Sequence, residues 1–155
     1  DLDQAHGTVF TPLAYVGLGV MYSRLSELAK AQFYFEKVHQ AVKQALVNGD
    51  DQDYLRLLTM IFYTAEYEAT REDFTTSNGL INDGVSLCSE QHVTYYLPRL
   101  KYLATANAIQ QCQPDEQIQQ LLSETVAFAR INHNQVVEVK AAALRRRYLQ
   151  ARKHA

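Results

Sequence analysis

Apolar residues recur at helical spacing near the start of the chain. Two sets of four follow the i, i+3, i+4, i+7 pattern that places side chains on one face of a helix. The first set is Tyr15, Leu18, Gly19 and Tyr22, and the second is Ala31, Phe35, Val38 and Val42. The stretch from Pro12 to Val42 therefore predicts two antiparallel helices joined by a short turn. Gly19 and Ala31 are small, so we expect them where the two helices approach most closely.

The helical periodicity continues along the rest of the chain. It predicts three helical hairpins, over about residues 11–47, 54–89 and 94–131, and a last helix over about residues 135–152. The last helix is expected to turn one apolar face toward the body, made of Val137, Ala141, Leu144, Tyr148 and Ala151. No run alternates with period two over more than four residues, so no strand is expected. The sequence predicts an all-α protein with a single domain over residues 1–155.

Polar residues, glycine and proline mark the expected helix ends. Thr11 and Pro12 combine an N-cap with a first-turn proline, and Asn48-Gly49 is a left-handed stop signal. Other expected signals are a Ser26 cap for the second helix, a capping box over residues 70–73 for the fourth, and a start of the fifth near Thr94 with Pro98 in its early turns. Residues 1–10 are expected to end an earlier element, and residues 50–53 to form an acidic loop.

The spacing in the first hairpin resembles the tetratricopeptide repeat (TPR). The matching pattern is Tyr15-x2-Leu18-Gly19-x2-Tyr22-x8-Ala31-x3-Phe35, with departures at Leu28 and Lys43. A degenerate second repeat aligns Ile61, Thr64, Ala65 and Glu68 with the first set, and Ser77, Ile81 and Gly84 with the second. The resemblance implies antiparallel hairpins stacked as a right-handed TPR-like superhelix, with the last helix as a C-terminal cap. Corresponding anchors, Tyr15, Ile61 and Leu100, are 46 and 39 residues apart, longer than the regular repeat of about 34.

Composition and charge limit the classes of function. No stretch approaches the roughly 20 apolar residues needed to span a bilayer, and no secretion signal opens the chain. Cys88 and Cys112 are far apart and are expected to be reduced, so we expect a cytoplasmic protein without membrane contact. The net charge is −2, but the last 26 residues are basic and the body is acidic. Arg145, Arg146 and Arg147 point in different directions around a helix, which disfavours one nucleic-acid-binding stripe.

Candidate chemistry for catalysis is sparse. The five histidines fall on different predicted elements, and none has a His or Cys partner at i+3 or i+4, so we expect no metal site and no cofactor. Neighbouring acids such as Glu66 and Glu68 are more typical of solvated charge than of a catalytic pair. No nucleophile elbow, phosphate-binding glycine loop or dinucleotide motif is present. We therefore expect that the protein is not an enzyme.

The TPR resemblance implies a concave groove lined by the first helix of each hairpin. Counting one, five and eight residues after each anchor gives the peptide-groove candidates, which are Val16, Val20, Ser23, Phe62, Glu66, Lys101 and Thr105, together with Ala69 and Ala108. Glu66 and Lys101 would hold an amine and a carboxylate of a peptide, or pair with each other or with solvent. Val16 and Val20 stand where co-chaperone TPR domains have Lys and Asn, so that carboxylate clamp is missing from the first repeat.

A second resemblance concerns residues 54–111. The segments Ile61-Phe62-Tyr63-x-Ala65, Glu72-Asp73-Phe74, Asn78-x-x-Ile81-x-x-Gly84 and Tyr95-Tyr96-Leu97-Pro98 resemble the peptide-sensing TPR domain of bacterial regulators of the Rgg and PlcR type. This implies a ligand-sensing and dimerisation domain that binds a short signalling peptide. Because the chain opens on Asp-Leu-Asp-Gln without Met, we expect a fragment whose DNA-binding domain is missing. The alternative is a constitutive protein-interaction scaffold with no small ligand.

Overall fold

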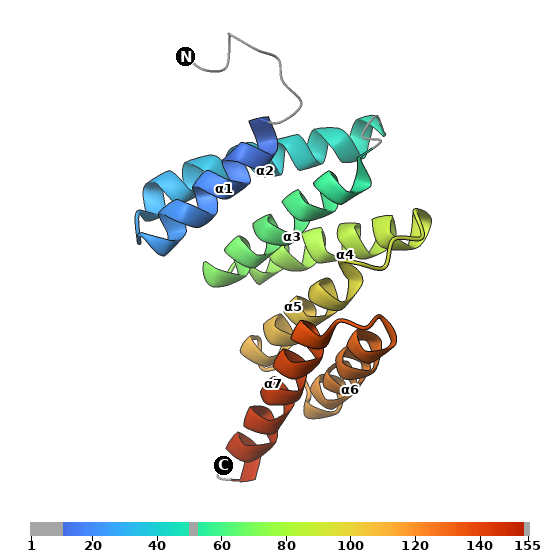
Figure 1. The fold of residues 1–155 in the computed structure, drawn as a ribbon. Coiled ribbons are helices and arrows are strands. Elements are labelled where there is room, and N and C mark those ends of the chain that lie inside the picture. Colours follow the sequence, from blue (N-terminus) through green and yellow to red (C-terminus); the bar gives the residue numbers. More distant parts are fainter. Residues whose placement is uncertain (1–10, 50–52, 154–155) are drawn as a thin grey trace.

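The computed structural model describes residues 11–49 and 53–153, and these residues form seven α-helices and no strand (Figure 1). The expectation of an all-α fold is confirmed. The helices are α1 (Thr11–Arg24), α2 (Leu28–Asn48), α3 (Tyr54–Thr70), α4 (Phe74–Glu90), α5 (Leu97–Gln110), α6 (Asp115–Ile131) and α7 (Gln135–Lys153). None of these helices is long and apolar enough to cross a membrane. The expectations for residues 1–10 and for most of the 50–53 loop lie outside the described residues.

The helices pack mainly against their neighbours in the chain. The pairs α1–α2, α3–α4 and α5–α6 are joined by short turns, and α7 packs on α5 and α6. The odd-numbered helices also contact one another in order, α1 with α3, α3 with α5 and α5 with α7. The pairs follow one another from the N-terminal to the C-terminal end of the molecule (Figure 1). One face of the stack is therefore built from α1, α3, α5 and α7.

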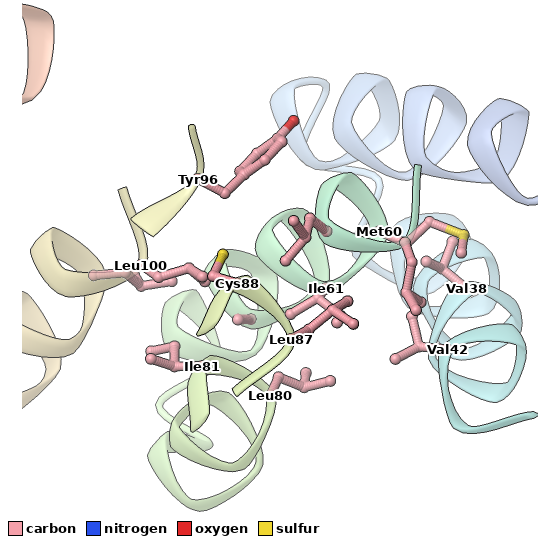
Figure 2. Packing of buried hydrophobic residues seen from close by; sticks show 14 of the residues in the cluster. Val38, Val42, Met60, Ile61, Leu80, Ile81, Leu87, Cys88, Tyr96 and Leu100 are labelled. Atoms are coloured by element: carbon pink, nitrogen blue, oxygen red, sulfur yellow. The ribbon is translucent and has the colours of Figure 1, made fainter. Parts of the chain in front are cut away.

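The largest apolar core lies around α3. Val38 and Val42 of α2 lie beside Met60 of α3, and Ile61 of α3 and Leu100 of α5 belong to the same cluster (Figure 2). Burial of one such aliphatic side chain contributes about 1.5–3 kcal/mol. Two smaller clusters extend this core. The first is Ala31, Phe35 and Tyr67, and the second is Ala108, Ile118 and Leu122.

Polar side chains inside the stack connect α3, α4 and α5. Ser77 donates its hydroxyl proton to the Ala65 carbonyl at 2.8 Å, and Asn107 donates to the Ser77 hydroxyl at 2.9 Å. Asn107 also donates to the Asn78 side chain at 2.9 Å. Buried polar groups cost stability unless they are paired, so these bonds favour one relative rotation of the three helices. All seven positions of the predicted second repeat, from Ile61 to Gly84, are buried.

Several helix ends differ from the prediction. Ser26 has a left-handed backbone (φ 59°), and α2 begins after it with Glu27 at the N-cap position. The fourth helix is capped by Asp73 alone, whose carboxylate accepts from the Thr76 N–H at 3.1 Å. Residue 70 still belongs to α3, so the expected capping box does not form. These differences arise because Ser26 lies in the turn before α2 and residue 70 lies at the end of α3, so neither is placed to cap the following helix.

The turns share a helix-ending conformation that the sequence pattern did not reveal. Within residues 11–49 and 53–153, five residues other than glycine adopt positive φ just after a helix, namely Ser26, Glu72, His92, Cys112 and His133. After each, a backbone N–H bonds back to the carbonyl five residues earlier, as from residue 73 to residue 68 at 3.0 Å. This closes the helix in the way usually reserved for glycine. At Gly49 the predicted left-handed stop signal is present, with φ 65°.

The later helices also shift relative to the prediction. α5 begins at Leu97 rather than near Thr94, because the preceding residues form an irregular connection that places Pro98 in the first turn. α7 buries Val137 and Ala141 as expected, but Ala151 is exposed. Near the end of α7, Tyr148 donates to the Asp115 carboxylate at 2.7 Å, and Arg152 forms an ion pair with the same carboxylate. Leu144 and Tyr148 also pack as expected, against the cluster of Ala108, Ile118 and Leu122. The polar contacts to α6 add to this apolar packing near the end of α7.

An aromatic and charged cluster closes one end of α3. The Tyr67 ring stacks on Phe35, with centroids 4.2 Å apart, and Arg71 lies over the Tyr67 ring at 5.7 Å. Glu68, only 7% exposed, forms an ion pair with Arg71 at 3.5 Å. Burial raises the pKa of Glu68, because the interior disfavours its charged form, while Arg71 opposes the shift. Burial likewise raises the pKa of Tyr67, so its hydroxyl stays neutral near pH 7.

Glycine is required at position 19 and optional at position 17. A Cβ at Gly19 would lie 2.8 Å from the Phe35 ring, which is held by its stack on Tyr67, whereas a Cβ at Gly17 would meet nothing within 4 Å. We expect Gly19→Ala to lower the free energy of unfolding by about 1–3 kcal/mol through overpacking. The matched variant Gly17→Ala should raise it by about 0.5–1 kcal/mol, because alanine favours the helix. Urea denaturation followed by circular dichroism measures both. Equal stability of the two variants would contradict the close contact.

The buried Glu68 carboxyl predicts a pH-dependent stability. Because its pKa is raised in the folded state, the folded protein holds the proton more tightly, and stability falls as pH rises from the ordinary carboxyl range through the raised pKa. Glu68→Gln removes this loss. Its free energy of unfolding should match that of the unmodified protein near pH 4 and exceed it at pH values above the raised pKa. Glu90→Gln, at an exposed position, controls for loss of one charge. A constant difference across this range would rule out the buried carboxyl as its source.

Candidate functional site

Three adjoining cavities run along the face built from α1, α3, α5 and α7. The first, of about 220 Å³, lies between α1 and α3 and is lined by Val20, Ser23, Arg24, Phe35, Tyr63, Glu66, Tyr67 and Thr70. The second, of about 280 Å³, lies among α3, α5 and α7 and is lined by Phe62, Tyr63, Glu66, Arg99, Tyr102, Val136, Val137 and Lys140. The third, of about 480 Å³, is lined by Thr94, Tyr95, Pro98, Arg99, Asn132, His133, Asn134, Gln135 and Val136.

Neighbouring cavities share lining side chains, and we call the three cavities together the groove. Tyr63 and Glu66 line both the first and the second cavity. Arg99 and Val136 line both the second and the third. The lining of the groove therefore comes from all four odd-numbered helices.

Three helices line the groove with the same spacing. The i, i+1, i+4 triplets are Phe62, Tyr63 and Glu66 on α3; Pro98, Arg99 and Tyr102 on α5; and Val136, Val137 and Lys140 on α7. Residues at this spacing lie on one side of a helix. The three positions of the triplet on α3 are repeated 36 residues later on α5, and a further 38 residues later on α7. α7 thus does more than cover the end of the stack, because it supplies the same kind of surface as α3 and α5.

Four of the seven predicted groove residues line this site. Val20 and Ser23 lie in the first cavity, Phe62 in the second, and Glu66 in both. Their prediction counted from Tyr15 on α1 and Ile61 on α3, the positions that the TPR resemblance supplied as anchors. Tyr63, Arg99, Tyr102 and Lys140 also line the groove but were not predicted. Arg99 and Tyr102 stand 36 residues after Tyr63 and Glu66 but differ from them in type, so the sequence gave no signal for this correspondence.

The other three predicted residues are placed elsewhere. Val16 is 5% exposed and belongs to the main core. Thr105 is fully buried and shares a hydrogen bond of 2.9 Å with Thr125 of α6. Lys101 holds its ammonium group 4.9 Å from the centre of the Phe128 ring, also on α6.

The register of α5 explains the placement of Lys101 and Thr105. The prediction took Leu100 as the anchor, 39 residues after Ile61, whereas the lining residues recur after 36. Moving the register of α5 by three residues rotates the selected face of the helix by about 60°. The selected side chains therefore face α6, and the groove receives Arg99 and Tyr102 instead. The expected pair of Glu66 with Lys101 is replaced by Glu66 and Arg99 in one cavity.

Charged side chains in the groove have no partner within the described part of the chain. Arg24, Glu66, Arg99 and Lys140 line it, and none forms a hydrogen bond or ion pair with another described residue. Three of the four are cationic. Charges on a partly enclosed, apolar wall act on a ligand more strongly than charges fully surrounded by water.

Arg99 is the most firmly placed of these charges. Its guanidinium carbon lies 5.3 Å from the centre of the Tyr95 ring and 5.6 Å from that of Tyr96. Tyr96 is buried, and its hydroxyl shares a 2.8 Å hydrogen bond with Thr59 of α3. Cation–π contacts of this kind contribute about 0.5–1 kcal/mol each at exposed sites. The tyrosines therefore orient Arg99 at the junction of the second and third cavities.

The described residues contain no group of three or more His, Cys, Asp or Glu side chains that could hold a metal ion. His6 and His154 lie outside these residues. Cys88 is buried in the main core, where burial raises the pKa of its thiol and favours the protonated form. Burial lowers the pKa of His39, which lies outside the groove. The groove offers aromatic faces, short apolar surfaces and unpaired charges, which together are binding chemistry.

Comparisons with known proteins do not connect the chain to a family. The scan against protein-family models, the search of curated proteins and the search of solved structures each found no match. The groove and its lining are therefore the basis on which a function is proposed.

Proposed function

We propose that this chain is a TPR-like domain that binds an extended peptide segment in the groove across α1, α3, α5 and α7. The observation that carries the proposal is the repeated i, i+1, i+4 lining of α3, α5 and α7. In this proposal the hairpins wind as a right-handed superhelix, and the groove is its concave side. Successive helices then offer successive subsites to one extended chain.

The chemistry of the groove favours a peptide over a compact small molecule. Its three cavities lie in series, and each combines a few polar groups with aromatic or aliphatic surface. Small-molecule sites are usually single enclosed pockets of about 300–1,000 Å³. Two of the three cavities are smaller than this, and a row of adjoining cavities fits consecutive side chains of a peptide. The charges without an ion-pair partner would give each position a preference for a particular kind of ligand side chain.

The resemblance to Rgg and PlcR-type regulators gives this proposal a biological setting. There the ligand is a short signalling peptide, the domain forms a homodimer, and DNA is bound by a separate N-terminal domain. Occupancy of the groove would shift the population between two arrangements of the stack, because small rotations between neighbouring repeats add along it. A scaffold that holds a longer protein segment would use the same groove. Affinity that reaches its maximum with a short peptide favours the sensor.

A peptide array tests the groove directly. Octapeptides of varied sequence are probed with the purified 155-residue chain, and selected peptides are measured by calorimetry and by thermal shift. At 100 times Kd a ligand adds about 2.7 kcal/mol to the free energy of unfolding, which raises Tm by several degrees for a chain of this size. We expect Phe62→Ala and Glu66→Gln each to weaken binding by about fivefold or more.

The matched control for this test is Glu116→Gln, which removes the same charge from an exposed position of α6 outside the groove. It should leave affinity unchanged. Circular dichroism checks that all variants keep their helicity. Absence of any binding peptide would overturn the proposed function, and binding that ignores both groove variants would place the peptide on another surface.

A further inference from the structure

We infer that the second cavity recognises one ligand carboxylate between Arg99 and Lys140, so that the groove selects peptides with an acidic group at this position. The inference rests on the proposed peptide-binding function and names the chemistry of one subsite. Arg99 and Lys140 lie on α5 and α7 and line the same cavity of about 280 Å³, with Glu66 of α3 in its wall.

The two cations form no ion pair within the described chain, although the residues up to 129 carry twice as many acidic as basic side chains. Glu66 lines the same cavity but pairs with neither of them, so the cavity wall carries two positive charges and one negative charge. Two like charges that share a cavity repel each other, and a carboxylate between them is attracted to both and offsets this repulsion. An anionic ligand group thus balances the remaining positive charge of the cavity.

The aromatic support of Arg99 prepares it for this role. The guanidinium carbon lies 5.3 Å from the centre of the Tyr95 ring and 5.6 Å from that of Tyr96, and the bond from Tyr96 to Thr59 fixes one of the rings. Because Arg99 forms no hydrogen bond with a described residue, its N–H groups remain available to a planar acceptor, and a carboxylate matches the guanidinium geometry in a bidentate manner. Because the side chain is already ordered, less conformational entropy is lost on binding.

Glu66 sets the orientation of a ligand in the subsite. It lines the second cavity from the α3 side, opposite in charge to Arg99 and Lys140, and continues into the first cavity. A second ligand carboxylate near α3 would be repelled, while an amine or an uncharged donor would be accepted. The carboxylate therefore lies toward α5 and α7, and a neutral or basic residue of the same ligand lies toward α1 and α3.

Matched peptides test the carboxylate directly. For a peptide from the array, each Asp or Glu is replaced by Asn or Gln, and the C-terminal acid by an amide, so that side-chain and terminal carboxylates are distinguished. Removal of the recognised carboxylate should weaken binding about tenfold or more. Arg99→Gln should weaken binding of the acidic peptide by a similar factor and leave its uncharged counterpart unaffected. The control Arg147→Gln, at an exposed position outside the groove, should change neither.

A second measurement does not depend on finding a peptide. N-acetyl-aspartate N-methylamide and its asparagine analogue are titrated into the labelled protein, and the NMR signal of the Arg99 Nε–H group is followed. A saturable shift with the aspartate compound alone supports the site, and equal shifts with both compounds overturn it. If array peptides bind in the groove but do not discriminate acid from amide, the inference is wrong and the proposed function stands. If none binds, the proposed function fails, and the titration alone decides whether the carboxylate site exists.

Discussion

The packing of α3 against four other helices is the constraint on which the rest of the structure depends. It contacts α1, α2, α4 and α5, and it buries eight of its residues. An apolar arc this broad leaves only a narrow strip of the helix uncovered. Phe62, Tyr63 and Glu66 lie on that strip and form the middle of the groove. The core and the candidate site thus lie on two sides of α3. Because one side is held in the core, the side chains on the other side must face the groove.

Hydrogen bonds inside the stack add directional information that apolar packing lacks. Aliphatic contacts tolerate small rotations between helices, whereas the bonds from Ser77 to the Ala65 carbonyl and from Asn107 to Ser77 require particular positions of α3, α4 and α5. Further along, Thr105 and Thr125 join α5 to α6. Such bonds add little net stability, since both partners lose water on folding. Their effect is to fix the rotation of α5, and with it the side chains that reach the groove.

Arg99 differs from the paired cations of the surface in what holds it. Elsewhere, Arg130 pairs with Glu138 at 3.0 Å, and Arg152 pairs with Asp115. Arg99 is held by two aromatic rings and forms no ion pair with a described residue. A guanidinium group that is ordered but not paired still attracts an anion. This ordering, together with the place of Arg99 in the wall of two cavities, supports a role in binding.

The sequence by itself determined the helices and the lining of the first half of the groove. Helical periodicity placed the seven helices, and Asn48-Gly49 marked the end of α2. Val20, Ser23, Phe62 and Glu66, which were counted from the TPR anchors on α1 and α3, line cavities of the groove. Tertiary structure alone decided the register of α5 and α7. Both helices carry apolar residues on more than one side, so periodicity cannot tell which side faces a neighbour. The turn before α5 and the hydrogen bonds of Thr105 make that choice, turning Lys101 toward α6 and Arg99 into the groove.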